Sequence, residues 1–575
     1  MYFKQTDEFD SIEAATYALH VTSDQIHVRL CGEEIAVLDP RSSVNTVGEG
    51  DATNTDAEAG TLSLTKSKEN NCYVYTWSSA SSLWTKKEYI LKCFDSHFEY
   101  FIRLTGKGDI DSVNYFSGDI SSPWHGSHYE FAEGYAPIAT IDDREKYYFS
   151  SAYSFVRFSY LMVPPMFCYA FRTEDIAPWL ALGLVAKPGE HQFVQFDYHT
   201  NNNKFYLSTD NTGHTKINGT WESPKIIGYS AENEFACMQK YAAYYFDNGL
   251  AQKKLPQAPN QLPRFWHGPM FCGWIEQGVL AAKEGGSCFD HASEKSYRKI
   301  QKLIEAQQLH PTIMIIDDKW QKQYGTLEVD PAKWTDMRGF IDEQKAKGIH
   351  VLLWFKMWDS EGLPEDMCVK GVAPVPVMAN SANRPMTDPT NPKYREFLKK
   401  AIYHLLSSDE GCCNADGFKL DFAFFQPTGR AIQSYDGKYG VELFHELVSY
   451  IYQCAKEAKP EAIINCSPCH PYFAHVCDQA RLHDYDGHWR NNFECMQHRQ
   501  KLYSMAIPNT LVDTDGSGFY SRRDTLRYIR RCTELGIPDL YEISDNVNLT
   551  FTEEERAEIR NVWETYSAKI DAMYK

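Results

Sequence analysis

Aspartates stand at the ends of several short apolar runs in the second half of the chain. Asp317 and Asp318 close one run, Asp421 lies in another, and Asp484 closes a third, with Asp486 two residues further on. A single aspartate in this place is as readily the N-cap of the following helix. Several aspartates that converge at one place need a further explanation, because like charges packed together are costly unless a ligand or a cation offsets them.

Two such carboxylates are what metal-free glycoside hydrolysis requires: an ionised nucleophile and a protonated acid, about 5–5.5 Å apart when configuration is retained. Lys419 precedes Asp421 by two residues and shares its strand face, where an ammonium group would hold the aspartate ionised. Asp421 is therefore the nucleophile candidate. Asp484 shares a face with Asp486, and a neighbouring negative charge favours keeping one of the two protonated. We predict Asp484 as the acid/base, with Asp486 as the alternative.

The elements that must position these residues follow a regular rhythm of apolar run, loop and amphipathic helix from residue 265 onwards. Eight βα units over about 310 residues predict a (β/α)₈ TIM barrel, whose active site lies at the carboxyl ends of its strands. Aspartates at 513, 515 and 545 end the last runs. The predicted strands are 270–274, 312–317, 350–358, 417–424, 462–467, 480–484, 509–515 and 539–545.

The first part of the chain has a different pattern. Short runs alternate apolar and polar residues between clusters of Gly, Asn, Asp and Ser, which predicts an antiparallel β-sandwich. Prolines at 256, 259 and 263 then mark a linker, since proline lacks the amide that helices and ladders need. We predict a β-sandwich domain over 1–255, a linker over 256–264 and the catalytic barrel over 265–575.

Several motifs in the barrel resemble those of clan D glycoside hydrolases, the α-galactosidase families 27 and 36 and the α-glucosidase/α-xylosidase family 31. The resemblance is closest to family 36, and the motifs occur in the expected order. They are the nucleophile motif Phe-Lys-Leu-Asp (418–421), the α-galactosidase-like Ile-Asp-Asp-Lys-Trp (316–320), Leu-Leu-Trp-Phe (352–355), Asp-Pro-Thr-Asn-Pro (388–392), Asn-Cys-Ser (465–467) and the run from Arg481 through Asp484 and Asp486 to Trp489.

This resemblance implies a retaining exo-α-glycosidase that acts on a terminal galacto-configured sugar, as an α-galactosidase or α-N-acetylgalactosaminidase. It implies no cofactor and no metal, and an oligosaccharide or glycoside as the partner. At 356–357 Lys-Met replaces the Glu-Pro-Glu usual in family 36. Indole faces at strand ends suit stacking on a pyranose, although any one tryptophan is more often simply buried. The expected sugar contacts are Asp317, Asp318, Trp320, Lys419, Arg481, Trp274, Trp354, Lys356 and Cys466.

Other interpretations stay open at this point. Asp-Pro-Thr-Asn-Pro and Gly-Phe-Lys-Leu-Asp-Phe also suit a family 31-like α-glucosidase or α-xylosidase, and a covalent intermediate would equally serve a transglycosylase. A non-catalytic carbohydrate-binding barrel is the alternative from another class, because a fold does not fix a function. Cys466, Cys469, His470, His475 and Cys477 suggest zinc by residue type, but the paired spacing of structural zinc sites is absent.

Composition and the absence of certain motifs exclude further classes of protein. The 575 residues carry 58 basic and 77 acidic side chains, a net charge of −19 that repels nucleic acid and anionic membranes. No secretory signal or 18-residue apolar run is visible, so we expect a cytoplasmic protein whose 16 cysteines are reduced. The sequence does not decide between a monomer and a homo-oligomer. It contains no P-loop or Gly-x-Ser-x-Gly motif, which argues against nucleotide and serine-hydrolase chemistry.

Overall fold

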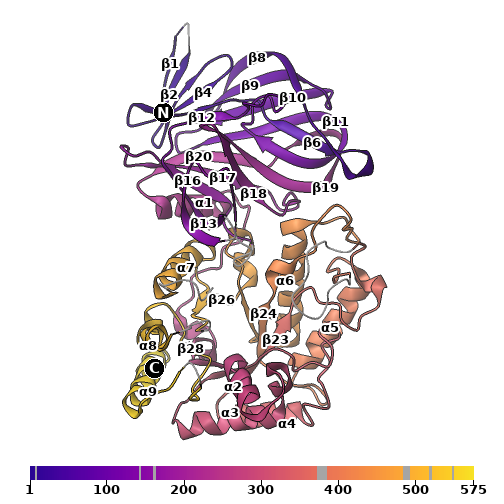
Figure 1. The fold of residues 1–575 in the computed structure, drawn as a ribbon, viewed down its shortest axis with the longest axis vertical. Coiled ribbons are helices and arrows are strands. Elements are labelled where there is room, and N and C mark those ends of the chain that lie inside the picture. Colours follow the sequence, from indigo (N-terminus) through magenta and orange to yellow (C-terminus); the bar gives the residue numbers. More distant parts are fainter. Residues whose placement is uncertain are drawn as a thin grey trace.

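The chain folds into an antiparallel β-region followed by a barrel, stacked along the long axis of the molecule (Figure 1). The computed structural model describes residues 1–6, 9–141, 144–158, 164–371, 385–482, 492–516, 521–546 and 549–575. Both fold classes predicted from the sequence, an N-terminal β-sandwich and a (β/α)₈ barrel, are confirmed.

Among the described residues, twenty strands make up the N-terminal β-region, and alternation along the strands separates the core face from the outer face. In β4, for example, Ile26, Val28 and Leu30 point into the core while His27 and Arg29 do not. The strands are β1 (Tyr2–Gln5), β2 (Asp10–Glu13), β3 (Ala18–Val21), β4 (Ile26–Leu30), β5 (Glu33–Leu38), β6 (Ser43–Val47), β7 (Thr53–Asn54), β8 (Glu58–Glu69), β9 (Cys72–Ser81), β10 (Lys86–Cys93), β11 (Phe98–Tyr115), β12 (Ser127–Tyr129), β13 (Glu133–Ile141), β14 (Arg144–Ser150), β15 (Phe155–Phe158), β16 (Cys168–Arg172), β17 (Trp179–Val185), β18 (Phe196–Asn201), β19 (Lys204–Glu222) and β20 (Lys225–Ala231).

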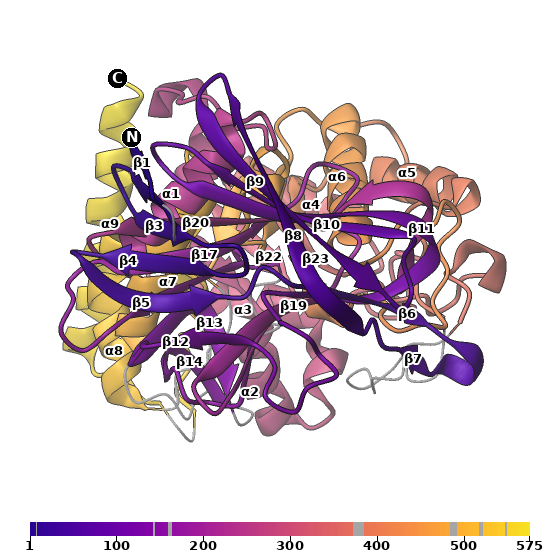
Figure 2. The same ribbon diagram turned by 90° about the horizontal axis from the view of Figure 1, so that it is seen from above.

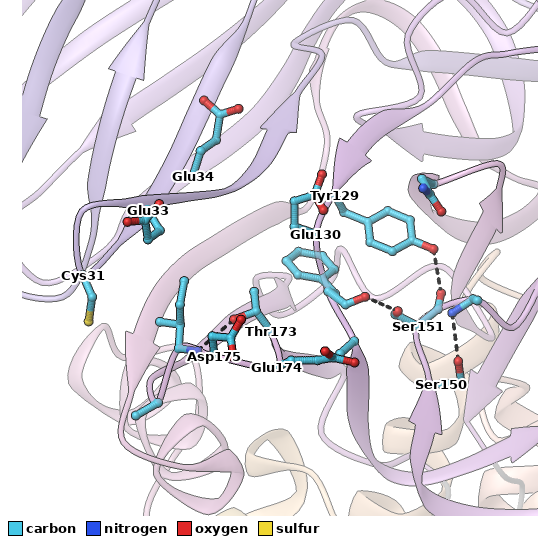
Figure 3. A pocket seen from close by; sticks show the side chains of 16 residues that line it. Cys31, Glu33, Glu34, Tyr129, Glu130, Ser150, Ser151, Thr173, Glu174 and Asp175 are labelled. Carbon is cyan, nitrogen blue, oxygen red and sulfur yellow. Dashed lines mark hydrogen bonds between the residues drawn. The ribbon is translucent and has the colours of Figure 1, made fainter.

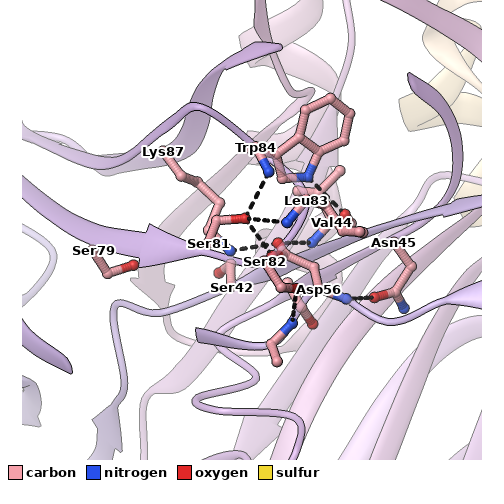
Figure 4. Close-up of polar contacts among 12 residues, drawn as sticks. Ser42, Val44, Asn45, Asp56, Ser79, Ser81, Ser82, Leu83, Trp84 and Lys87 are labelled. Atoms are coloured by element: carbon pink, nitrogen blue, oxygen red, sulfur yellow. Dashed lines mark hydrogen bonds and ion pairs between the residues drawn. The ribbon is translucent and has the colours of Figure 1, made fainter. Parts of the chain in front are cut away.

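A fully buried ion pair fixes the segment between β7 and β8 against β10 (Figure 4). Asp56 pairs with Lys87, and both side chains are inaccessible to solvent. The same carboxylate accepts hydrogen bonds from the Val44 amide at 3.0 Å and the Ser81 hydroxyl at 2.6 Å. Because every polar atom of a buried charge needs a partner, these bonds hold the segment in one position.

Helix α1 (Glu234–Asp247) ends the N-terminal region. Asn233 caps it, its side chain accepting a hydrogen bond from the Ala236 amide. Between α1 and the first barrel strand lie only two short 3₁₀ turns, Pro259–Gln261 and Arg264–His267. The predicted linker falls in this stretch, and the exact domain boundary stays a prediction.

The barrel contains eight strands that pair in parallel, in sequence order, with β28 beside β21. Such strands are buried on both faces, which explains continuous apolar runs such as the Ile-Met-Ile-Ile of β22. Parallel bridges from 513 to 537 and from 516 to 540 bring the last strands together. The strands are β21 (Met270–Cys272), β22 (Ile313–Ile316), β23 (His350–Lys356), β24 (Gly417–Asp421), β25 (Ile463–Cys466), β26 (Gln479–Arg481), β27 (Leu511–Asp513) and β28 (Asp539–Leu540).

Helices surround these strands, each burying one face. In α3 the buried Tyr297, Ile300 and Ile304 recur at helical spacing, while the opposite face is charged. The helices are α2 (Trp274–Glu284), α3 (Glu294–Ala306), α4 (Met337–Ala346), α5 (Pro392–Leu406), α6 (Gly440–Ala458), α7 (Asn492–Ala506), α8 (Arg522–Arg531) and α9 (Glu553–Met573). Within the described ranges, no helix is long and apolar enough to cross a membrane.

The β-region covers the barrel when the molecule is seen from above (Figure 2), and it touches loops that follow barrel strands. Arg430, in the loop after β24, forms an ion pair of 2.7 Å with Asp111 of β11. His214 of β19 stacks on Tyr439 with ring centres 3.7 Å apart. Pro165 bridges to Cys469 in the loop after β25. The N-terminal region therefore rests on the carboxyl-end face of the barrel, where an active site is expected.

Candidate active site

Asp421 is the last residue of β24, and three donors among the described residues contact its carboxylate. The Trp354 indole nitrogen lies 3.0 Å from Oδ2, whereas the Arg481 guanidinium and the Phe422 amide each lie 2.8 Å from Oδ1. Phe422 has a left-handed φ of 61°, which ends the strand at this point. A bulky residue seldom adopts such a φ, and this kind of local strain clusters at functional sites.

Arg481, the last residue of β26, joins Asp421 to a second carboxylate. Its side chain is about 1% exposed, and a second guanidinium nitrogen lies 3.1 Å from Oδ2 of Asp515. A planar guanidinium presents several donors in fixed directions, which suits a cation that bridges two carboxylates. The structure thus brings together the predicted nucleophile and a predicted sugar contact, with Arg481 touching the carboxylate itself.

Lys419 has a different partner from the one expected. Its Nζ lies 2.9 Å from Oδ2 of Asp317, 3.5 Å from the Cys272 sulfur and 3.1 Å from the Tyr541 hydroxyl. Burial alone would lower the pKa of Lys419, but the adjacent Asp317 carboxylate outweighs it and holds the pKa well above its usual range. The contacts that favour ionised Asp421 come instead from Arg481 and from neutral N–H donors.

Asp318 is set apart from Asp317 by its environment. Its Oδ1 accepts a hydrogen bond of 2.8 Å from Tyr324, whose ring lies 3.8 Å from the Lys319 Nζ and 4.2 Å from the Lys356 Nζ. Burial raises the pKa of Asp318 to about 7, and the neighbouring Asp317 charge adds to the rise. Asp318 can therefore change protonation state near neutral pH.

Lys356 is buried at the end of β23 and is already paired, its Nζ lying 2.8 Å from the Asp359 carboxylate. Its position beside the Tyr324 ring and 5.3 Å from the centre of the Phe422 ring keeps it close to both Asp318 and Asp421. The predicted role as a sugar contact stays a prediction.

The deeper barrel interior holds more carboxyl groups than cations. Burial raises the pKa of Asp513 to about 6, with Asp515 adding to the shift. Burial and the charge of Asp513 likewise hold the pKa of Asp539 well above its ordinary value. Neutral forms of these two groups reduce the repulsion around Asp515, which keeps Arg481 and the Tyr541 hydroxyl as partners.

Two predicted stacking tryptophans serve other purposes. Trp320 is fully buried, and its indole nitrogen donates to the Trp354 carbonyl at 2.8 Å, so it supports the backbone of β23 and offers no face to a sugar. Trp354 is 1% exposed and acts through its N–H on Asp421. Trp274 is half-buried at the start of α2, with its ring centre 5.9 Å from that of Phe289.

Cys466 and the neighbouring Cys/His stretch lie within the packing between the two regions. Cys466 is fully buried in β25, and burial raises the pKa of its thiol well above the usual value. His470 is also fully buried, 3.2 Å from the Tyr241 hydroxyl of α1. In the part of the chain that the structure describes, no group of three or more His, Cys, Asp or Glu is placed to hold a metal ion.

The acid/base candidates cannot be placed. Asp484, Asp486 and Trp489 lie outside the described residues, between Leu482 and Asn492. The distance from either aspartate to Asp421 therefore stays a prediction, and so does the choice between them. The preceding strand end is described, since Arg481 closes β26.

Sequence reasoning missed Cys272, Tyr324 and Tyr541. Cys272 ends β21 and Tyr541 directly follows β28, so the rule that picked out the strand-end aspartates would have found both if it had been extended to thiol and phenol groups. Tyr324 lies in the loop after β22, and no spacing in the sequence indicates its contact with Asp318.

Residues 285–514 match the model of the glycosyl hydrolases family 31 TIM-barrel domain. No curated protein sequence is significantly similar to the chain. Among solved structures, a family 31 sulfoquinovosidase from E. rectale aligns at 14% identity and TM-score 0.57, over 97% of this chain and 85% of that one.

An α-galactosidase from Thermus thermophilus, in complex with stachyose, aligns at 14% identity and TM-score 0.51, over 87% of this chain and 99% of its own. A cycloalternan-degrading enzyme from Trueperella pyogenes, in complex with a covalent intermediate, aligns at 11% identity and TM-score 0.52, over 96% of this chain and 84% of that one. At these identities the structural likeness shows the fold alone. The family match over residues 285–514 shows a TIM-barrel domain similar to that of glycosyl hydrolases family 31, and with this domain the chain is a glycosidase.

Proposed function

We propose that the chain is a retaining exo-α-glycosidase with Asp421 as its nucleophile. The observation that carries this assignment is exposure. The Asp421 side chain is 15% exposed, whereas those of Asp317 and Asp515 are 4% and 0% exposed. Among these three carboxylates at the carboxyl end of the barrel, Asp421 is the most exposed to an incoming sugar, and its contacts favour the ionised form.

In the proposed first step, Asp421 attacks the anomeric carbon and forms a glycosyl ester. The carbon–oxygen bond to the leaving group breaks, and the departing oxygen takes a proton from Asp484 or Asp486. In the second step the same acid/base deprotonates a water, which releases the sugar and restores the Asp421 carboxylate. The covalent intermediate reported for the Trueperella pyogenes enzyme supports this two-step course.

For the sugar we propose a terminal α-linked galacto-configured residue. The adjacent Asp317 and Asp318 resemble the hydroxyl clamp of α-galactosidases, and an α-galactosidase is among the structural neighbours. A gluco- or xylo-configured sugar is the second candidate, favoured by the family 31 model that matches the barrel. Transfer to a sugar hydroxyl in place of water would use the same intermediate.

A panel of aryl α-glycosides that differ only at C2, C4 and C6 tests both the proposed mechanism and the proposed sugar. A preference for the axial C4 hydroxyl supports the galacto assignment, and a preference for the equatorial one favours the second candidate. Asp421→Asn should abolish turnover of whichever glycoside is accepted while sugar binding survives. If the wild-type protein turns over no aryl α-glycoside, the retaining mechanism with Asp421 is wrong.

A further inference from the structure

A pocket of about 660 Å³ lies between the loops that follow β23 and β24. We call it the rim pocket; its lining residues include Glu365, Lys370, Asp388, Gln433 and Tyr435. Its size falls in the range of small-molecule sites, about 300–1,000 Å³. Both loops rise from the carboxyl ends of neighbouring strands, so the pocket opens on the same face of the barrel as Asp421.

Short bonded steps connect the pocket to the nucleophile. The Trp358 indole nitrogen donates to the carbonyl of Ala423, two residues after Asp421, at 3.2 Å. The Trp358 carbonyl in turn accepts from the Thr387 amide at 3.2 Å, and Thr387 precedes the buried Asp388 of the pocket. These contacts link the backbone at the edge of the rim pocket to the loop that follows Asp421.

Tyr435 gives the pocket an aromatic surface. Its side chain is 69% exposed, although burial of a large ring is usually favourable. Tyrosine offers a flat apolar face with a polar hydroxyl at its edge, a combination suited to the alternating apolar face and hydroxyl rim of a pyranose.

The loop that carries Tyr435 is fixed on the pocket side. The Asp388 carboxylate accepts from the Tyr435 amide at 2.7 Å, and the Thr390 hydroxyl accepts from the Asp436 amide at 3.3 Å. Lys370 and Gln433 exchange both backbone hydrogen bonds, at 2.9 and 3.0 Å. A platform held this way loses little conformational entropy when a ligand binds.

The N-terminal region fixes the same loop from the other side. Arg430 pairs with Asp111 and also donates to the Thr53 hydroxyl at 2.9 Å. The His214 ring donates to the Gly429 carbonyl at 3.1 Å. Thr53 lies three residues before Asp56, the residue anchored by the buried Lys87 (Figure 4). The β-region therefore positions the segment that presents Tyr435.

The charges in the pocket favour a neutral ligand. Its acidic residues Glu365, Asp366 and Asp388 are nearly balanced by Lys370 and Lys393, and Asp366 pairs with Lys393. Carboxylate groups accept hydrogen bonds from sugar hydroxyls. Amide groups both donate hydrogen bonds to such hydroxyls and accept hydrogen bonds from them. Among the described residues that line the pocket, the lysines do not outnumber the carboxylates, so no excess of positive charge selects a phosphate or sulfate.

A wider hollow of about 1010 Å³ on the N-terminal region contrasts with the rim pocket (Figure 3). Its lining includes five carboxylates and no lysine or arginine, and its two aromatic rings, Tyr129 and Phe131, are each only 5% exposed. It therefore offers no stacking face, and the rim pocket is the better candidate for a sugar.

We propose that the rim pocket is a second carbohydrate subsite, in which Tyr435 stacks on a sugar unit of an oligosaccharide substrate away from the cleaved bond. This proposal rests on the proposed glycosidase function and extends it to the substrate class: oligosaccharides are preferred over glycosides with a small aglycone. The remote sugar then contributes binding energy that an aryl glycoside lacks.

The test compares Tyr435→Ala with wild type on two substrates that share a terminal sugar, a 4-nitrophenyl α-glycoside and an oligosaccharide. Raffinose and stachyose serve for galactose, and isomaltotriose serves for glucose. We expect kcat/KM to fall roughly fivefold to tenfold more on the oligosaccharide than on the aryl glycoside. Tyr435→Trp should restore the ratio. Tyr403→Ala, which removes another exposed tyrosine from the barrel surface, should leave the ratio unchanged.

Equal changes on both substrates, or no change on either, would overturn the subsite. Thermal unfolding of each variant shows whether the fold is intact. If wild type turns over no glycoside, the proposed function fails, and titration calorimetry of wild type and Tyr435→Ala with the same oligosaccharides decides the subsite separately. Binding that is lost in Tyr435→Ala supports the pocket; binding that is unaffected by the change, or absent from wild type, contradicts it.

Discussion

Arg481 and Asp421 lie 2.8 Å apart at the ends of two barrel strands, and the same guanidinium reaches Asp515 at 3.1 Å. One buried cation thus connects three strand ends, those of β24, β26 and β27. Opposite charges at this distance favour the ionised carboxylate. The contact with Arg481 therefore favours, before any sugar binds, the ionised state that the proposed nucleophile needs.

Substitution of Arg481 should change the pH profile of the enzyme. Without the guanidinium, Arg481→Gln should move the acidic limb of kcat/KM to higher pH, because the carboxylate loses its stabilising cation. Arg481→Lys keeps one charge but cannot bridge both carboxylates, so kcat should fall while the limb stays near its original pH. Limbs that coincide in wild type and Arg481→Gln would show that the cation does not control ionisation.

Asp318 should make the stability of the protein depend on pH. Its pKa in the folded protein is about 7, against an ordinary value of 3.8. The unfolded chain ionises first as pH rises, so the free energy of unfolding should decrease from about pH 4 and level off above about pH 7. Three pKa units correspond to at most about 4 kcal/mol.

The comparison with Asp318→Asn isolates this contribution. Denaturant unfolding of both proteins at pH 5 and pH 8 should show a smaller loss in the variant, because asparagine does not ionise. Other titrating groups affect both proteins alike and cancel in the difference. Parallel losses in the two proteins would mean that Asp318 titrates in the folded state near its ordinary pKa.

The repeating pattern of the chain was enough to predict the barrel and the sandwich, but the barrel strands end one to five residues earlier than predicted; β26 ends at Arg481 rather than 484, and β28 ends at Leu540 rather than 545. The pattern could not predict the contacts that depend on how the barrel closes. Lys419 and Asp421 do share a strand face, but Lys419 lies one layer deeper, where it meets Asp317, directly after β22, and Tyr541, directly after β28. Spacing along one strand cannot show which residues of other strands enter the same layer.

The burial of Trp320 has a similar cause. Lys319 takes a left-handed φ of 78° just after the β22 aspartates, and the next indole turns inward onto the Trp354 carbonyl. A backbone turn of this kind in a lysine leaves no sign in the sequence. The motif therefore predicted the right residues at the strand end but the wrong surroundings for the tryptophan.

The Lys419–Asp317 pair should behave as one buried unit. Lys419→Met leaves the Asp317 carboxylate buried beside only its thiol and amide donors, which should cost about 3–5 kcal/mol of unfolding free energy. Adding Asp317→Asn to that variant should recover much of the loss, since the uncompensated charge is gone. Denaturant unfolding of the two single variants and the double variant completes the cycle. Additive losses would indicate that the two groups do not interact.

Trp354 should matter through one hydrogen bond. Trp354→Phe keeps an aromatic ring in the buried position but removes the N–H that lies 3.0 Å from the Asp421 carboxylate. A hydrogen bond to a charged group contributes about 1.5–3 kcal/mol, so kcat should fall roughly tenfold or more if the bond orients the nucleophile.

Trp334→Phe is the matched control, because Trp334 is also buried and its N–H donates to the Ala292 carbonyl at 2.9 Å. It should lower thermal stability to a similar degree and leave kcat close to wild type. Equal losses of kcat in the two variants would trace the effect to packing rather than to the carboxylate.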